Sequence, residues 1–289
     1  MELTPTLLGT IGLNTLVLAA MYILASLGFA FIFNMLGSIN LAHGAIYMFG
    51  AYVCYYVGDA FGLSNWLSML IAAIVLALFG LVLERFMFRP FLNDFSKIIM
   101  LGVALMTILQ TATTILAGTK VQQIPSFGEG TTNILGLPLS NEKIVTFAVG
   151  IVLLLITMYV VGNTALGRQM EAVSQDRLGA ALQGIPIHRV SAIVCAIGCA
   201  LAAVSGSMMG AYQKMSPYMG DNMNLRILML VMLAGAGSMR GVIITGALMG
   251  LLDSFAFVLL DGYIASAVVA GIVVILLLIR PKGFFGHEM

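Results

Sequence analysis

The placement of charged residues constrains this chain more than any other feature of its sequence. Residues 3–58 contain no Asp, Glu, Lys or Arg, and further charge-free runs cover 60–83, 98–119, 144–167, 190–213 and 262–279. A helix needs roughly 20 apolar residues to cross a hydrocarbon layer about 30 Å thick, and there it must satisfy its own backbone hydrogen bonds. Each run is long enough for one crossing, and 3–58 is long enough for two. We therefore expect this chain to fold as membrane-spanning helices.

Composition agrees with a lipid environment. Hydrophobic residues make up 61% of the chain and charged residues 9%, whereas a soluble domain carries about 25% charged residues. The net charge of +1 provides no basic field for nucleic acid. The N-terminus lacks the positive region and cleavage site of a secretory signal, so the first apolar stretch is expected to remain as a span.

We expect an all-α integral membrane protein, with one polytopic helical domain over residues 1–289 and about nine membrane segments, some of them discontinuous. The segments are expected at 7–33, 39–57, 66–88, 97–118, 144–162, 190–211, 225–239, 242–260 and 262–280.

Lys and Arg residues beside the spans predict the orientation, because cytoplasmic connections carry more of them. One set of connections carries nine: Arg85, Arg89, Lys97, Arg168, Arg177, Arg189, Arg240, Arg280 and Lys282. The opposite set carries four: Lys120, Lys143, Lys214 and Arg226. The first set is therefore expected in the cytoplasm, together with the C-terminus, and the N-terminus is expected outside.

The largest cytoplasmic segment, 163–189, is longer than a turn requires. Leu178, Ala181, Leu182 and Ile185 recur at helical spacing, and Gly184 with Pro186 supplies a stop signal. This pattern predicts one or two short amphipathic helices whose apolar stripe lies against the protein body. The charged candidates for contact with a partner are Arg168, Glu171, Asp176 and Arg177. The alternative is a plain interfacial linker.

Polar residues and glycines interrupt the second apolar segment. Asn40 and His43 are costly in hydrocarbon unless they face a cavity or a neighbouring helix. Gly37, Gly44 and Gly50 indicate a broken or closely packed backbone. A discontinuous helix beside a solute path is one interpretation. The other, favoured for these two polar residues, is that they hydrogen-bond where helices meet.

A second glycine-rich stretch lies near residue 240. Gly237 and Gly241 form a pair that lets helices approach closely, and residues 237–240 faintly echo 37–40. Short, glycine-interrupted segments in matching positions indicate inverted repeats around a central site.

Two further polar residues lie within apolar helices and are candidates for the translocation path. Asp253 is an intramembrane carboxylate, which is a functional-site candidate by default, although a bond to a neighbouring helix would also explain it. Gln110 requires a partner from outside its own helix.

No catalytic, cofactor or metal site is expected. The sequence contains no Gly-x-x-x-x-Gly-Lys-Ser/Thr loop, no HExxH and no Gly-x-Ser-x-Gly. We therefore expect neither nucleotide binding in the P-loop manner nor enzymatic activity in this chain.

The segment Asn40–Gly44, followed by Tyr47–Met48 and Gly50–Tyr52, resembles the signature of the branched-chain amino acid ABC importer permeases of the LivH type. Residues 167–190 are similar to that family's ATPase-facing loop, and 237–241 to its late glycine-rich segment. Residues 239–241, Met-Arg-Gly, stand where the family usually has Pro-Gly, a departure that bears on the solute.

The resemblance implies an inner-membrane permease without a cofactor. It implies a heterodimer with a second homologous permease subunit, two ATP-binding subunits and a periplasmic solute-binding protein. The solute would be a branched-chain amino acid or a similar small polar molecule, with urea or a short amide as the alternative. A stand-alone secondary transporter or channel is the competing class, and a membrane-embedded enzyme lacks a nucleophile–base pair.

Overall fold

The computed structural model describes residues 5–92, 94–134, 137–235, 237–260 and 262–285. Within these residues the regular structure is helical apart from one hairpin of two short strands and one isolated β-bridge. Its helices are α1 (Pro5–Leu36), α2 (His43–Phe61), α3 (Asn65–Leu83), α4 (Phe95–Ala117), α5 (Asn141–Asn163), α6 (Ala165–Gln175), α7 (Arg177–Leu182), α8 (Ile187–Tyr212), α9 (Met219–Ala234), α10 (Met239–Leu259) and α11 (Gly262–Ile279). A π turn (Glu84–Phe88) and a 3₁₀ turn (Arg89–Phe91) extend α3, and the strands are β1 (Thr131–Ile134) and β2 (Leu137–Ser140).

Among the described residues, six helices are long and apolar enough to cross a membrane. They are α1, α3 with its extension, α4, α5, α8 and α10. Each of the nine predicted segments contains a described helix, but α2 carries His43 and Asp59, α9 has 16 residues, and the apolar part of α11 is Ile264–Ile279. The predicted count of about nine spans is therefore not confirmed.

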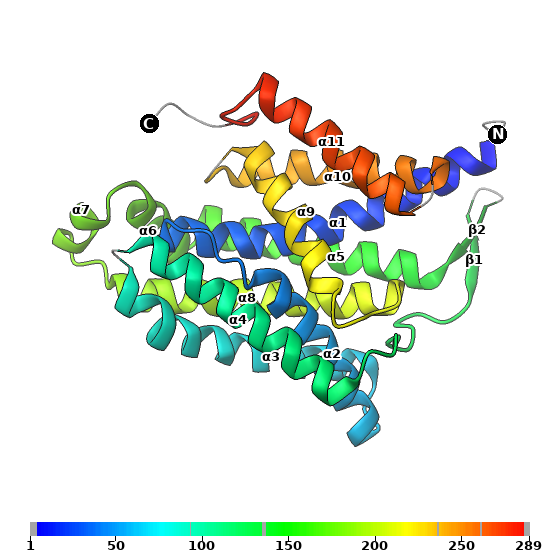
Figure 1. The fold of residues 1–289 in the computed structure, drawn as a ribbon, viewed down its shortest axis with the longest axis horizontal. Coiled ribbons are helices and arrows are strands. Elements are labelled where there is room, and N and C mark those ends of the chain that lie inside the picture. Colours follow the sequence, from blue (N-terminus) through cyan, green and yellow to red (C-terminus); the bar gives the residue numbers. More distant parts are fainter. Residues whose placement is uncertain (1–4, 93, 135–136, 236, 261, 286–289) are drawn as a thin grey trace.

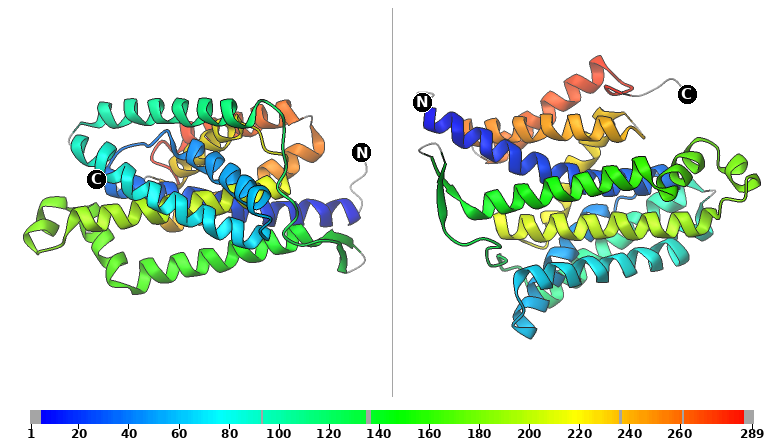
Figure 2. Two further views of the ribbon diagram at one scale, coloured as in Figure 1. Left: turned by 90° about the horizontal axis from the view of Figure 1, so that it is seen from below. Right: turned by 180° about the vertical axis from the view of Figure 1, so that it is seen from behind.

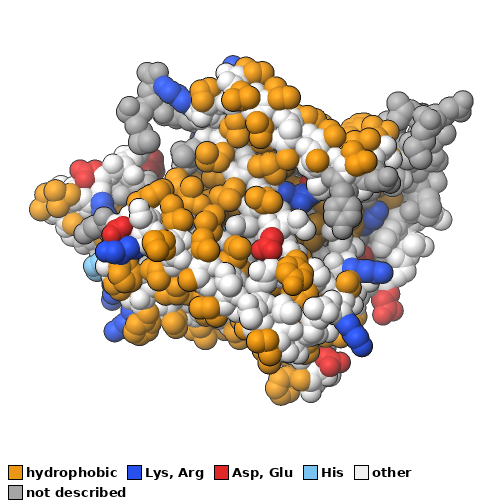
Figure 3. Space-filling model, viewed as in Figure 1, with side chains coloured by type: hydrophobic (Ala, Val, Ile, Leu, Met, Phe, Trp, Pro, Cys, Tyr) orange, Lys and Arg blue, Asp and Glu red, His pale blue; other side chains and the backbone are white. Residues whose placement is uncertain are grey.

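The two ends of the bundle differ. The helices α6 and α7 project from one end, and β1 and β2 lie at the other (Figures 1 and 2). Charged side chains gather toward these two ends, and apolar side chains cover much of the face between them (Figure 3). This distribution suits a protein whose middle lies in lipid.

The hairpin lies in the connection between α4 and α5. β1 and β2 pair antiparallel, with Thr131 opposite Ser140. Glu142, in the first turn of α5, fastens the preceding chain, because its Oε2 accepts hydrogen bonds from Ser126 Oγ (2.5 Å) and Phe127 N (2.6 Å). Strands of only four residues leave little signal in a sequence.

Helices α1 and α8 cross at the centre of the bundle through two glycines. A Cβ atom on Gly28 would lie 2.6 Å from Gly198 O, and one on Gly198 would lie 2.7 Å from Gly28 O. The contact is reciprocal, so neither residue can be larger without separating the helices. α10 packs along α1, and α3 packs along α8.

Helices α2 and α9 each follow a non-helical connection, 37–42 and 213–218. Their first turns touch, since a Cβ on Gly44 would collide with Gly220 O and one on Gly220 would lie 2.6 Å from Gly44 O. In both places a long helix, a short non-helical connection and a second helix follow one another along the chain. The inverted repeats expected from the likeness of 37–40 to 237–240 remain a prediction.

Candidate functional site

The connection 37–42 is fastened to its neighbours by polar groups. His43 Nε2 lies 3.0 Å from Ala25 O in the middle of α1, and Asn40 Oδ1 accepts a hydrogen bond from Ala42 N at 3.1 Å. Asn224 of α9 donates to Leu41 O at 3.0 Å. These bonds fit the structural interpretation of Asn40 and His43. Nevertheless, Asn40 Nδ2 and His43 Nδ1 are buried without a partner among the described residues.

The five glycines singled out in the sequence fall into two groups. Gly37 (φ +64°) and Gly237 (φ +89°) lie in connections with backbone angles that favour glycine. Gly44, Gly50 and Gly241 lie in helices at close approaches. An added Cβ would meet Ala203 of α8 at Gly50 and Ala234 O at Gly241, 2.6 Å away.

Gln110 finds the outside partner that its position in α4 requires. Its Nε2 donates to Asp221 Oδ2 at 2.8 Å, and Asp221 lies in the first turn of α9. The bond joins α4 to the start of α9. It does not bring Gln110 to Asp253 or to His43.

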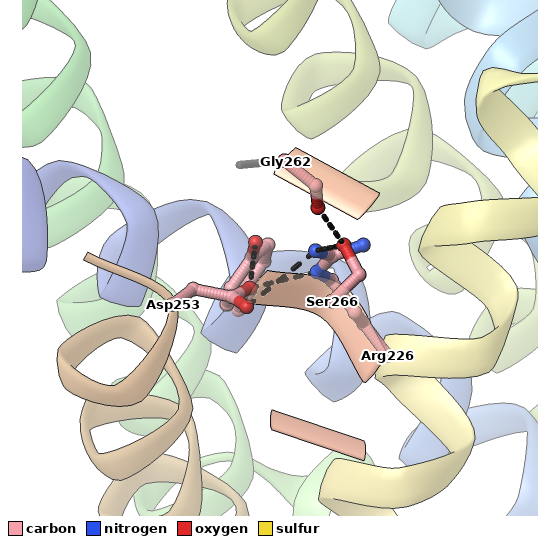
Figure 4. Close-up of polar contacts among 5 residues, drawn as sticks. Arg226, Asp253, Gly262 and Ser266 are labelled. Atoms are coloured by element: carbon pink, nitrogen blue, oxygen red, sulfur yellow. Dashed lines mark hydrogen bonds and ion pairs between the residues drawn. The ribbon is translucent and has the colours of Figure 1, made fainter. Parts of the chain in front are cut away.

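Asp253 is fully buried and lies at the centre of a polar cluster contributed by four helices (Figure 4). Arg226 of α9 donates from Nε to Asp253 Oδ2 at 2.7 Å, and Tyr22 of α1 donates to the same oxygen at 2.5 Å. Arg226 Nη2 also reaches Ser266 Oγ of α11, 3.4 Å away. A buried carboxylate is tolerated when it is paired and hydrogen-bonded in this way.

This cluster corrects one sequence-based interpretation. The sequence places Arg226 among the external loop charges, but Arg226 lies inside α9 and its side chain is 15% exposed. For Asp253 the sequence leaves open a functional carboxylate or a bond to a neighbouring helix, and the structure pairs it with Arg226 of α9. Moving Arg226 from the loops into the bundle strengthens the charge asymmetry on which the orientation rests. The signal available in the sequence was that a lone acid in hydrocarbon requires a cation nearby.

A cavity of about 470 Å³ adjoins the cluster. Its polar lining includes Asn222, Arg226, Ser266 and residues of the connection 213–218, and its apolar lining includes methionine and aromatic side chains. The lining residues are Tyr22, Tyr47, Met209, Gln213, Lys214, Ser216, Met219, Asn222, Met223, Arg226, Phe257, Gly262 and Ser266. The volume falls within the range of small-molecule sites. Of the predicted path residues, Asp253 lies directly behind Arg226, whereas Asn40, His43 and Gln110 are not among the lining residues.

The segment 163–189 forms the two short helices that the sequence predicts. In α6, Met170 and Val173 are buried against the body, while Arg168 and Glu171 are exposed. Asp176 caps α7, accepting hydrogen bonds from Leu178 N (3.0 Å) and Gly179 N (2.9 Å).

The orientation of α7 differs from the prediction. Leu178 and Leu182, expected to lie against the body, are 72% and 79% exposed. Arg177, expected to face outward, donates to Met35 O at the end of α1, 3.4 Å away. Of the predicted stripe, Ile185 lies beyond the end of α7 and is partly buried, whereas Leu178, Ala181 and Leu182 are exposed. Helical spacing alone could not show which surface these residues face.

Together, a bundle with several apolar spans, a cavity with a buried charged cluster and an amphipathic element at one end define a polytopic membrane transport protein. The family described as "Branched-chain amino acid transport system / permease component" matches residues 11–279. The chain belongs to this family. It is a multi-pass protein of the bacterial inner membrane.

Individual relatives cover almost the whole chain. The high-affinity branched-chain amino acid transport system permease protein BraD of Pseudomonas aeruginosa is 28% identical, over 95% of this chain and 94% of that protein. The LivH permease protein of Escherichia coli, from a transport system with the same description, is 27% identical with the same coverage.

A solved structure supports the fold. PsaBC from Streptococcus pneumoniae in complex with Fab matches with a TM-score of 0.52 and 17% identity, over 93% of this chain and 91% of that one.

Proposed function

We propose that this chain is the membrane-spanning subunit of an ABC importer for branched-chain amino acids or a similar small polar solute. It would act as one half of a permease heterodimer, with two ATP-binding subunits and a periplasmic solute-binding protein. ATP hydrolysis would belong to the partner subunits. The family and the names of the relatives support this proposal.

The single observation that most supports coupling to an ATP-binding subunit is the geometry of α6 and α7. Met170 and Val173 hold α6 on the body, and the Asp176 cap fixes where α7 begins. Leu178 and Leu182 then project from a short, capped helix, and none of the described residues covers them. Full burial of a leucine side chain contributes about 1.5–3 kcal/mol, so this pair suits docking into a cleft on an ATP-binding subunit.

The charges around this pair have a smaller expected effect. Arg168 and Glu171 are exposed, and exposed ion pairs contribute about 0–1 kcal/mol. Asp176 and Arg177 are engaged within the chain and hold α7 in position. We therefore propose that the two leucines provide most of the docking free energy, and that Asp176 and Arg177 fix the position of α7.

The proposal is tested with the double variant Leu178→Ala/Leu182→Ala in the complete complex, reconstituted in lipid nanodiscs. Its matched control is Leu116→Ala, because Leu116 at the end of α4 is 78% exposed. The double variant is expected to lose at least about tenfold of the ATP hydrolysis that loaded binding protein stimulates, since 1.4 kcal/mol corresponds to roughly a factor of ten. The control is expected to hydrolyse ATP as the wild type does. Normal coupling in the double variant would refute the docking role of α7.

The cluster at Asp253 argues against the competing class of a stand-alone secondary transporter. Such a transporter normally carries an intramembrane carboxylate that binds and releases a coupling ion. Asp253 is instead occupied by Arg226 and Tyr22.

A further inference from the structure

The charged residues that line the cavity beside α9 are cationic. Arg226 and Lys214 line it, and among its described lining residues there is no Asp or Glu. Asp253 balances Arg226 but is fully buried behind it, so the carboxylate does not face the cavity. A solute in the cavity therefore meets cationic hydrogen-bond donors.

Some N–H donors of Arg226 make no hydrogen bond to the described residues. Its Nε bonds to Asp253, and its Nη2 bonds to Asp253 and Ser266. Its Nη1 has no hydrogen-bond partner among the described residues. A guanidinium presents five N–H donors in a rigid fork that matches a carboxylate. The contacts with Asp253 and Ser266 hold that fork in place.

The rest of the lining suits an apolar side chain. Met209, Met223 and Phe257 face the same cavity as Arg226, together with the ring of Tyr47. The 213–218 connection forms part of the wall, and it pairs through Met215 with Gln122 of the loop leading to the hairpin. The cavity thus lies toward the end of the bundle that the charge pattern assigns to the outside.

We infer that Arg226 binds the carboxylate of the transported solute in this cavity, and that Asp253 positions Arg226. The solute class is a small molecule with a carboxylate and an apolar side chain, as in a zwitterionic amino acid. The inference rests on the proposed function, because it names the solute chemistry of a permease. Arg226 is the recognition residue, and the methionine and aromatic wall receives the solute's tail.

The test measures binding to the assembled importer complex in nanodiscs, without its solute-binding protein, by saturation-transfer NMR. The probes are L-leucine and isoamylamine, which is leucine without its carboxylate. Wild type is expected to bind L-leucine at least about tenfold more tightly than isoamylamine, since hydrogen bonds to charged groups are the strong ones.

The decisive variant is Arg226→Gln/Asp253→Asn, which removes both charges so that neither is left buried alone. It is expected to bind L-leucine only as weakly as isoamylamine. Arg226→Lys, which keeps the charge but not the fork, is expected to fall between the two.

The matched control is Glu84→Gln/Arg89→Gln. It neutralises another pair with a fully buried carboxylate, whose Arg89 Nη2 and Glu84 Oε2 lie 2.7 Å apart, outside the cavity. Both probes are expected to bind this variant as they bind the wild type. A merely structural role for the Arg226–Asp253 pair would lower thermal stability without changing the ratio between the two probes.

The inference would be overturned if the Arg226→Gln/Asp253→Asn variant bound L-leucine with unchanged affinity. It would also be overturned if the wild type bound both probes with equal affinity or did not bind L-leucine. An anionic phospholipid that co-purifies with the wild type but not with this variant, while leucine binding is unchanged, would identify a lipid site instead. Failure of ATP-driven leucine uptake by the wild-type complex would refute the proposed function and leave the binding result standing.

Discussion

The crossing of α1 and α8 yields a quantitative prediction about Gly28→Ala. The added methyl group would lie 2.6 Å from Gly198 O and 3.4 Å from its Cα. The obstacle is backbone, so no side chain can rotate away, and the helices must separate by about 0.8 Å to reach ordinary contact. Overpacking of this kind costs about 1–3 kcal/mol.

Gly12→Ala is the matched control on the same helix. A Cβ at Gly12 meets nothing within 4 Å. Both variants gain the same helix propensity, about 1 kcal/mol for Ala over Gly. The difference between them therefore isolates the crossing, and Gly28→Ala is expected to be less stable than Gly12→Ala by about 1–3 kcal/mol.

The assay uses thiols that the protein already carries. Cys54, Cys195 and Cys199 are buried and free, and the last two flank Gly198 on α8. A thiol-reactive fluorogenic dye should therefore report thermal unfolding of the purified protein in detergent. The midpoint of Gly28→Ala is expected several degrees below that of Gly12→Ala, at roughly 2–4 °C per kcal/mol. Equal midpoints, or a higher one for Gly28→Ala, would refute the close crossing.

Three further predictions follow from single contacts. Tyr22→Phe removes the hydrogen bond to Asp253 and is expected to lower the stability measured by thermal unfolding by about 1.5–3 kcal/mol. The hydroxyl of Tyr47 has no partner among the described residues, so Tyr47→Phe should change the unfolding midpoint little. Asp176→Ala removes the α7 cap, worth about 1 kcal/mol, and should reduce stimulated ATP hydrolysis, whereas Asp176→Asn should retain most of it; equal losses would exclude the cap as the cause. A cysteine placed by Ser174→Cys in a cysteine-free background should resist membrane-impermeant thiol reagents in intact cells, and ready labelling would reverse the predicted orientation.

The positions of the helices could be predicted because lipid imposes a simple rule. A backbone in hydrocarbon must be helical, and charges are expelled from it. The charge-free runs therefore place α1, α3, α4, α5 and α8 to within a few residues. The start of α2 could not be placed in this way, because residues 37–42 carry no charge and lie within the run 3–58. The bends and the turn that they form depend on tertiary contacts, such as the hydrogen bond from Asn224 of α9 to Leu41 O.

Only one member of the central ion pair could be identified from the sequence. The sequence identifies Asp253 as a carboxylate that needs a partner, but Arg226 lies near a predicted span boundary and resembles an ordinary loop charge. The pair is 27 residues apart on different helices, so no local pattern links them. Likewise, helical spacing shows that Leu178 and Leu182 share a face, while the choice between the protein body and a partner depends on tertiary packing.

Uptake by proteoliposomes tests the central claim most directly. The vesicles would contain this chain with its partner permease and the ATP-binding subunits, with loaded solute-binding protein outside. We predict that radiolabelled L-leucine accumulates only when hydrolysable ATP is enclosed and when every subunit is present. Accumulation driven by an ion gradient in vesicles that contain this chain alone would contradict the account.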